Sequence, residues 1–282
     1  MPSPSGTVTR FAPSPTGQLH LGHAYSALFA ENAARREGGR FLLRIEDIDP
    51  ARCRPEFEAA IYEDLAWLGL QWEKPVRRQS EHLDEYRAAL DRLSKMQLVY
   101  PCFCSRKEIQ AEIAQAASAP QGPDGPLYPG TCRGLGPAER ERRVAEDRPY
   151  ALRLDVAAAC RKTGELHWHD RERGTIAAQP ELLGDVVLGR RDVPASYHLA
   201  VTLDDHRQAI TLVTRGEDLF AATHVHRLLQ ALLDLATPDY HHHRLLTNAK
   251  GERLAKRDRA LALSALRQGG RSPAEVRALA GF

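Results

Sequence analysis

Hydrophobic residues in the first 68 positions follow two periods in turn, and this alternation constrains the fold more than any other feature of the chain. A short strand is expected at 7–12, a proline-rich turn at 13–17 and an amphipathic helix at 23–37. A second strand is expected at 40–45 and a second helix at 55–68. Strands that alternate with helices form a parallel sheet covered by helices, and ligands collect at the carboxyl ends of the strands. The sequence therefore predicts an α/β fold with its ligand site at that edge.

The middle of the chain has a different pattern. After a helix expected at 81–97, residues 119–136 are rich in proline and glycine and cannot form a regular helix. Short β-like runs follow at 150–156, 166–169 and 185–188, with turn residues between them. We interpret this region as an α+β module that is inserted into the α/β fold.

The α/β pattern resumes after the insertion. Strands are expected at 197–203 and 209–214, a strongly periodic helix at 219–235 and a short strand at 243–246. Apolar positions near the end of the chain suffice for two short helices. The expected parts are 1–98 as the first half of the core, 99–190 as the inserted module, 191–262 as the second half of the core and 263–282 as a short helical tail.

Composition excludes several classes of protein. The chain has 282 residues, of which 43% are hydrophobic and 27% charged, as is typical of a soluble globular protein. No run approaches the roughly 18 apolar residues of a membrane span, and the N-terminus lacks a secretory signal. A cytoplasmic location without a membrane partner is therefore expected. The net charge of +2 neither requires nor excludes binding to a nucleic acid.

The loop between the first strand and the first helix has the residues of an anion-binding site. Its small residues let a backbone approach a phosphate, and the helix that follows offers free N–H groups. His20 and His23 flank Gly22, so both imidazoles could face one ligand. The alternative is that these are ordinary capping and turn residues.

A basic segment lies near the end of the chain. Arg253-Leu-Ala-Lys-Arg257 follows a turn at 248–252, and its cations provide a positive surface suited to polyphosphate or RNA. The alternative is a solvated loop, because most runs of charge are simply surface.

Three of the five cysteines cluster in the inserted module. Cys102 and Cys104 form a Cys-x-Cys pair, and Tyr128 and Cys132 form a Tyr-x-x-x-Cys pair. Thiolates favour zinc, four ligands complete a tetrahedron, and a phenolate oxygen can replace a missing thiol. One structural zinc ion is therefore expected, with buried free thiols as the alternative.

In combination, His20-Leu-Gly-His23 and Arg253-Leu-Ala-Lys-Arg257 resemble the two signatures of class I aminoacyl-tRNA synthetase catalytic domains. These are a His-x-Gly-His motif after the first strand and a Lys-Met-Ser-Lys-Ser-type loop after the last. Ala255 stands where serine is usual, whereas Lys256 keeps the position expected to contact ATP phosphates. The resemblance implies a Rossmann-type, nucleotide-binding catalytic core on either side of the inserted module.

Further motifs resemble the glutamyl branch of this family and arrive in the family's order. They are Arg10-Phe-Ala-Pro-Ser-Pro-Thr-Gly17, Arg44-Ile-Glu-Asp-Ile-Asp49, Ser196-Tyr-His-Leu-Ala200 and Arg215-Gly-Glu-Asp-Leu219. Glutamate requires cationic groups for its carboxylates and an anion for its ammonium group, and Arg10, Arg215 and Glu46 supply that set. The alternative for Glu46 and Arg215 is a structural ion pair.

The resemblance also implies roles for individual residues. His20, His23 and Lys256 are implied as catalytic, because they would stabilise charge while the glutamate carboxylate attacks the α-phosphate of ATP, with Mg²⁺ accompanying the nucleotide. The residues implied in ATP binding are Pro13, Thr16, Gly17, His20, Gly22, His23, Arg253 and Lys256. Those implied in glutamate binding are Arg10, Ala12, Ser14, Glu46, Tyr197 and Arg215, and those implied in zinc binding are Cys102, Cys104, Tyr128 and Cys132.

Residues 257–282 are expected to form no separate anticodon-binding domain. This arrangement resembles the glutamyl-queuosine tRNA(Asp) synthetases, a truncated paralogue family. Members of that family activate glutamate without tRNA and transfer it to the queuosine base in the anticodon loop of tRNA(Asp). The resemblance implies ATP, L-glutamate and that tRNA as partners of a monomer.

Three alternatives stay open. The chain could be the catalytic domain of a standard glutamyl-tRNA synthetase, which charges the 3′ end of tRNA(Glu), or another nucleotidyltransferase of the His-x-Gly-His type. It could also be a non-catalytic, zinc-bearing RNA-binding module, although Lys256 and the paired histidines argue against this.

Overall fold

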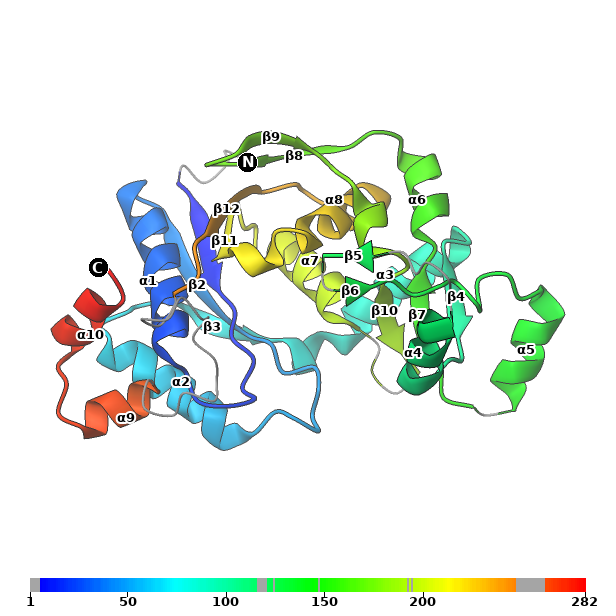
Figure 1. Ribbon diagram of the computed structural model, residues 1–282. Coiled ribbons are helices and arrows are strands. Elements are labelled where there is room, and N and C mark those ends of the chain that lie inside the picture. The colour runs from blue at the N-terminus through cyan, green and yellow to red at the C-terminus, as the bar shows by residue number, and fades with distance from the viewer. Residues whose placement is uncertain are drawn as a thin grey trace.

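The N-terminal part of the chain forms a parallel sheet of three strands with helices between them (Figure 1). The strands are β1 (Val8–Phe11), β2 (Arg40–Ile45) and β3 (Glu73–Arg78), and the helices are α1 (Leu21–Arg36) and α2 (Pro55–Trp67). The predicted strand–helix alternation is confirmed, and β3 adds a strand whose polar sequence gave no signal. The computed structural model describes residues 6–115, 121–123, 125–146, 148–191, 193, 195–246 and 262–282.

A second sheet lies beside β1. Its strands, in spatial order, are β11 (Leu212–Gly216), β12 (Asp239–His243), β8 (His167–Asp170) and β9 (Gly174–Ala177). β11, β12 and β8 pair in parallel, and β9 pairs antiparallel to β8. The amide of Thr211 donates to the carbonyl of Val8 at 3.0 Å, which joins the start of β11 to β1. The carboxyl ends of β1 and β11 therefore lie next to each other, where ligands bind in α/β sheets.

The segment between the two sheets contains an antiparallel sheet of its own, drawn in cyan and green on the right of Figure 1. The hairpin β8–β9 comes from this part of the chain but joins the core sheet through β12. Its other strands are β4 (Val99–Cys102), β7 (Ala151–Leu154), β10 (Val187–Arg190), β5 (Gln121–Gly122) and β6 (Gly125–Pro126), and its helices are α4 (Arg106–Gln115), α5 (Pro137–Ala145) and α6 (Val156–Thr163).

Two large hydrophobic cores support these sheets. One lies under α1 and α2, where Leu28 and Leu65 are fully buried, and the C-terminal helices close it with Val276. The other joins three core helices to the inserted strands. Within the described ranges, no helix is both long and apolar enough to cross a membrane. The remaining helices are α3 (Leu83–Lys95), α7 (Tyr197–Arg207), α8 (Ala222–Leu232), α9 (Leu263–Gln268), α10 (Pro273–Leu279) and the 3₁₀ turns η1 (Gln79–His82), η2 (Pro180–Leu183) and η3 (Glu217–Leu219).

One predicted strand is a helix in the structure, and another lies a few residues earlier than predicted. Residues 197–203 belong to helix α7. Every residue from Leu199 to Asp205 is buried, so the segment lacks the one-sided hydrophobic pattern that would indicate a helix. The strand predicted at 243–246 is instead β12, which ends at His243. The two short C-terminal helices are confirmed.

A buried ion network ties α7 to the first sheet. Arg44 on β2 is fully buried and contacts the carboxylates of Asp204 and Asp205 on α7. Asp204 also accepts hydrogen bonds from Arg77 Nε at 2.8 Å and the Tyr86 hydroxyl at 2.9 Å. Because buried charges are stable only when paired, each member of the network depends on the others.

We expect the substitution Asp204→Asn to lower the free energy of unfolding by about 3–5 kcal/mol, because it leaves Arg44 short of negative charge in the core. Urea unfolding measures this change. Asp234→Asn, which breaks an exposed pair with Arg92, is the control and should have little effect. Equal stability of the two variants would contradict a structural role for the network.

Candidate active site

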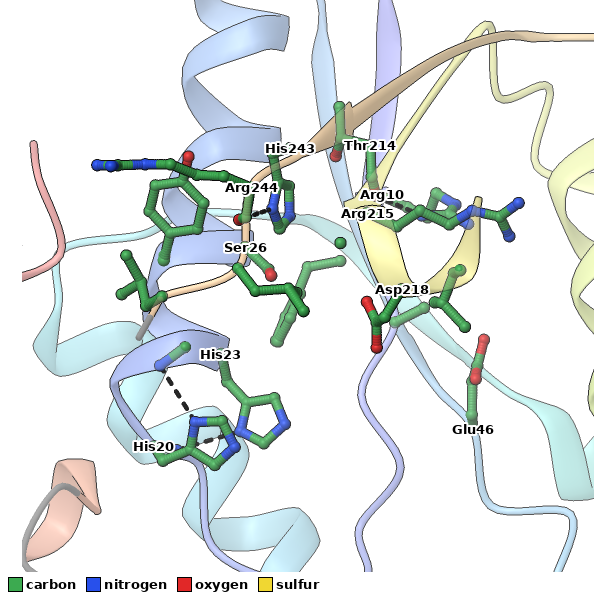
Figure 2. Close-up of a pocket in the computed structure, with 18 of the residues that line it drawn as sticks. Arg10, His20, His23, Ser26, Glu46, Thr214, Arg215, Asp218, His243 and Arg244 are labelled. Atoms are coloured by element: carbon green, nitrogen blue, oxygen red, sulfur yellow. Dashed lines mark hydrogen bonds between the residues drawn. The ribbon is translucent and has the colours of Figure 1, made fainter. Parts of the chain in front are cut away.

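A cavity of about 510 Å³ opens at the carboxyl ends of the core strands (Figure 2). Figure 2 shows two histidines at one end of the cavity and two arginines with a glutamate at the other. These residues come from segments far apart in the chain, which the two sheets bring together. The residues that line the cavity and enter the argument below are Arg10, Ala12, His20, Gly22, His23, Glu46, Tyr197, Thr214, Arg215, Asp218 and His243.

The two histidines cap the N-terminus of α1. His20 Nδ1 accepts a hydrogen bond from the amide of Gly22 at 3.1 Å, and His23 Nδ1 accepts one from the amide of His20 at 3.1 Å. Their rings stack with centroids 3.8 Å apart. Because Nδ1 accepts in both rings, each neutral ring carries its proton on Nε2. The capping alternative is thus realised, yet both rings also line the cavity.

Gly22 makes this cap possible. A Cβ atom at this position would lie 3.0 Å from the ring of His20, which is tighter than nearly all such contacts. A side chain there would displace the ring that caps the helix. The first turn of α1 also contains no acidic residue, so its N-terminus favours an anion.

Arg10 is buried and already paired. Its Nε and Nη2 donate to the carboxylate of Asp205 at 2.8 and 3.2 Å, and its Nη1 donates to the carbonyl of Thr214 at 3.2 Å. Asp205 also accepts from Arg44, so one carboxylate serves two guanidinium groups. Arg10 therefore enters the cavity with much of its charge balanced.

Arg215 has a different environment. It is 6% exposed, and its donors meet His242 Nε2 at 3.2 Å, the Tyr197 hydroxyl at 3.3 Å, His226 Nδ1 at 3.1 Å and the Thr223 hydroxyl. All four acceptors are neutral groups. Among the residues that the structure describes, Arg215 forms no ion pair, although Arg10 and Arg44 each form at least one. The structure therefore contradicts an ion pair between Arg215 and Glu46 within this set.

Glu46 lies just beyond β2, 3.3 Å from Arg44 Nη2. Burial raises the pKa of Glu46 above its ordinary value, although the charges of Arg44 and Arg10 oppose this shift. A cationic group that bound beside Glu46 would favour its ionised form. The backbone amide of Glu46 donates to the carbonyl of Pro13 at 3.0 Å, which fixes the loop after β1 against the end of β2.

The other predicted site residues are not all at this cavity. Ser14 lines an adjoining hollow of about 230 Å³, which shares Glu46 and Tyr197 with the main cavity. Of the described loop residues, Pro13, Thr16 and Gly17 line neither.

The basic segment that contains Arg253 and Lys256 lies outside the described residues. The described residues on either side of this segment, Leu246 and Ala262, are close to the cavity. Leu246 lines the cavity, and Ala262 forms a β-bridge with His20.

Sequence reasoning missed several residues of the cavity. Thr214 Oγ1 and His243 Nε2 are buried and have no hydrogen-bond partner within the described part of the chain. Asp218 also lines the cavity, inside the motif that begins at Arg215. His243 is at the carboxyl end of β12. A correct prediction of β12 would therefore have indicated that His243 lines the cavity.

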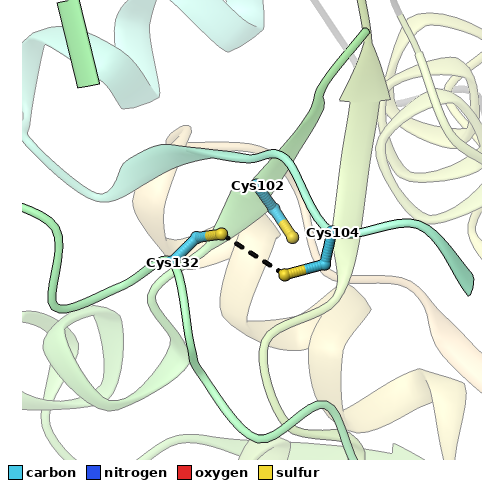
Figure 3. Close-up of side chains that lie close together, drawn as sticks. All are labelled: Cys102, Cys104 and Cys132. Carbon is cyan, nitrogen blue, oxygen red and sulfur yellow. Dashed lines mark hydrogen bonds between the residues drawn. The ribbon is translucent and has the colours of Figure 1, made fainter. Parts of the chain in front are cut away.

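The segment between the two sheets brings the three clustered cysteines together (Figure 3). Their sulfur atoms all lie within 4.8 Å of one another, and Cys104 Sγ is 3.5 Å from Cys132 Sγ. The Tyr128 hydroxyl lies 3.9 Å from Cys104 Sγ and accepts from the amide of Cys132 at 2.9 Å. Burial opposes ionisation of Cys132, but the amide of Phe103 and the Tyr128 hydroxyl lower its pKa overall. The cluster has the residues and spacing to hold a metal ion.

Comparison with known proteins agrees with this geometry. The family described as "tRNA synthetases class I (E and Q), catalytic domain" matches residues 7–278. A glutamyl-Q tRNA(Asp) synthetase from Rhodobacter capsulatus is 52% identical over 98% of this chain and 100% of its own length. One from Nocardia farcinica is 45% identical over 97% of this chain and 83% of its own length.

A solved structure shows the same fold. The glutamate-tRNA synthetase of Elizabethkingia anophelis superposes with a TM-score of 0.76 at 30% identity, over 90% of this chain. The chain spans about half of that protein, 53% of its length. Since the family match covers nearly the whole chain, the protein belongs to the class I tRNA synthetases, in the catalytic-domain family of the E and Q enzymes.

Proposed function

We propose that the protein activates L-glutamate with ATP, without tRNA, and transfers the glutamyl group to the queuosine base in the anticodon loop of tRNA(Asp). The observation that carries the glutamate assignment is the buried Arg215 guanidinium, which faces the cavity without an ion pair among the described residues. A buried cation of this kind favours an anionic ligand. The name of the Rhodobacter capsulatus relative supports the acceptor.

Glutamate would occupy the end of the cavity that holds the arginines. Arg215, helped by Arg10 and the Tyr197 hydroxyl, would hold the side-chain carboxylate, and Glu46 would hold the ammonium group. Ala12 lines the same end, and Ser14 reaches it from the adjoining hollow. This arrangement leaves the α-carboxylate directed toward the histidines.

ATP would occupy the opposite end. The N-terminus of α1 and the Nε2–H groups of His20 and His23 provide donors for phosphate oxygens, and Gly22 lets the phosphates approach the backbone. Arg253 and Lys256 would approach from the segment whose described ends reach the cavity. Pro13, Thr16 and Gly17 would shape the loop beside the nucleotide, and Mg²⁺ would accompany its phosphates.

The proposed reaction has two steps. In the first, an oxygen of the glutamate α-carboxylate attacks the α-phosphorus of ATP, and pyrophosphate leaves. In the second, a hydroxyl group of the acceptor base attacks the activated carbonyl carbon, an ester forms, AMP leaves and the hydroxyl proton is released. His20, His23 and Lys256 would stabilise the charge that develops on the phosphates, so catalysis consists of positioning and electrostatic stabilisation.

We expect the wild-type protein to catalyse ATP–pyrophosphate exchange with glutamate in the absence of tRNA, and to reject glutamine. Arg215→Gln should raise the KM for glutamate about 100-fold, because it removes the cation that recognises the carboxylate. Arg40→Gln is the control, because Arg40 is exposed and pairs with Glu73 away from the cavity. Exchange driven equally by glutamine, or an unchanged KM in Arg215→Gln, would contradict the glutamate assignment.

The acceptor is tested with labelled glutamate and two forms of tRNA(Asp). Label should appear only on tRNA(Asp) that contains queuosine, and nuclease digestion should place it in the anticodon loop. A protein that instead labels the 3′ end of tRNA(Glu) would be a standard glutamate-tRNA ligase domain. The fold shared with the glutamate-tRNA synthetase of Elizabethkingia anophelis makes this the outcome to exclude.

We also propose that Cys102, Cys104, Tyr128 and Cys132 bind one structural zinc ion. Tetrahedral zinc with bonds of about 2.3 Å to sulfur separates two sulfur ligands by about 3.8 Å, close to the 3.5 Å between Cys104 and Cys132. The amide of Phe103 donates to Cys132 Sγ at 3.4 Å, a contact that stabilises a thiolate ligand. Four protein ligands would leave no position for a substrate, so the metal would be structural.

Protein purified without chelators should contain about one zinc ion per chain by mass spectrometry of the metal. Cys104→Ser should lose most of this zinc, because it removes one thiolate of the set. Cys160→Ser is the control, since Cys160 is outside the cluster. Wild-type protein with no zinc, or zinc retained fully in Cys104→Ser, would contradict the site.

A further inference from the structure

A buried aspartate and a buried histidine lie directly behind Arg215. Asp170 is the last residue of β8, and His242 lies on the neighbouring strand β12, to which β8 pairs in parallel. Both side chains are 0% exposed, and His242 Nδ1 is 2.7 Å from Asp170 Oδ2. The opposite ring nitrogen, Nε2, faces Arg215 Nε at 3.2 Å. The three groups therefore form a line from β8 to the cavity.

The hydrogen bonds in this line fix the tautomer of His242. An arginine can only donate, so His242 Nε2 must accept and carries no proton. The proton is then on Nδ1 and is donated to the carboxylate of Asp170. The Thr223 hydroxyl accepts from Arg215 Nη2 and lies 3.1 Å from the same Nε2, to which it can donate its own proton.

The protonation states agree with this geometry. Burial and the charge of Arg215 lower the pKa of His242 to about 3, so the ring is neutral near pH 7. Burial opposes ionisation of Asp170, but hydrogen bonds from the His242 ring and the amide of Glu172 lower its pKa overall. Asp170 is therefore an anion that, among the described residues, contacts Arg215 through a neutral ring and not directly.

We propose that Asp170 is a positioning residue that fixes Arg215 for glutamate by setting the tautomer of His242. This inference rests on the proposed function, in which Arg215 holds the side-chain carboxylate. With its proton on Nε2, His242 would present an N–H group to the N–H of Arg215, and the guanidinium would turn away. With the proton on Nδ1, the ring holds Arg215 in place without neutralising it.

A second histidine supports Arg215 in the same manner. His226 Nδ1 lies 3.1 Å from Arg215 Nη1 and must accept, so its Nε2 carries the proton and faces His198 Nδ1 at 3.2 Å. Burial and the charge of Arg215 lower the pKa of His226 well below its ordinary value. Neutral acceptors thus hold the guanidinium on two sides, and Asp170 is the carboxylate that orients one of them.

The test is the substitution Asp170→Asn. Asparagine keeps a carbonyl for the amides of Glu172 and Arg173, which Asp170 Oδ1 accepts at 3.0 and 3.1 Å. It places an amide donor opposite His242 Nδ1, which moves the ring proton to Nε2. We expect the KM for glutamate in ATP–pyrophosphate exchange to rise about tenfold or more, while the KM for ATP changes little.

A second substitution separates positioning from a general structural role. In His242→Gln the amide oxygen can accept from Arg215 whatever the state of residue 170. In that background, adding Asp170→Asn should change the KM for glutamate less than twofold, because its effect acts through the ring. An equal rise in both backgrounds would overturn the proposal, as would an equal rise in the KM for ATP.

The chain offers a matched control in Glu172→Gln. Glu172 pairs with His241 Nε2 at 3.0 Å, beside the Asp170–His242 pair, but this pair is partly exposed and makes no contact with Arg215 within the described residues. The KM of the Glu172→Gln variant for glutamate should equal that of the wild type. A rise as large as that of Asp170→Asn would overturn the proposal.

A spectroscopic measurement keeps the test valid if a variant does not fold. Long-range ¹H–¹⁵N spectra of the wild type, with His242→Gln used for assignment, should show His242 in the Nδ1–H form and neutral from pH 8 to pH 5. An Nε2–H form, or protonation in this range, would overturn the proposal. A wild type that lacks glutamate-dependent exchange refutes the proposed function and the positioning role with it; normal exchange with unaltered kinetics in Asp170→Asn refutes only the positioning role.

Discussion

The charge of the cavity depends on the partners of three buried arginines. Arg10 and Arg44 share the carboxylate of Asp205, and Arg44 also contacts Asp204. Arg215 receives only neutral acceptors from the described residues. Buried charge is stable in a fold only when something balances it, so the first two arginines belong to the scaffold, and in the proposed function the third would bind the ligand. In the proposed function, this asymmetry, rather than the number of cations, would determine which end of the cavity accepts a carboxylate.

Local periodicity predicted the first half of this arrangement and could not predict the second. The alternation from β1 to α2 could be predicted because β1 and β2 are short runs buried on both faces, whereas α1 and α2 each bury one stripe. Helix α7 gave no such signal, since Leu199–Asp205 is buried on every side, and the segment was mistaken for a strand. The error matters, because α7 supplies Asp205. The partner of Arg10 lies 195 positions away, and only the fold reveals that pairing.

The motif residues show why two interpretations of a short pattern need not exclude each other. His20 and His23 are capping residues through Nδ1, and they line the cavity as well. The cap fixes the tautomer that makes each ring a donor, so the structural role would prepare the rings for the phosphate contacts that we propose. The cysteine pattern could be interpreted for another reason: thiol chemistry limits what such a cluster can do, and Cys102 and Cys132 converge although 127–135 are loop and turn.

Histidine is an unusual choice for the groups that hold a buried cation, and its chemistry accounts for the choice. A carboxylate in the place of His242 would bind Arg215 more strongly, but it would cancel the charge that the proposed glutamate ligand would contact. A serine or an amide would keep the charge and could rotate, with either a donor or an acceptor facing the guanidinium. A neutral imidazole has one acceptor, and a buried anion behind it determines which nitrogen that is. The β8–β9 hairpin supplies this anion, so the segment between the two sheets would contribute to the proposed glutamate site as well as to the cysteine cluster.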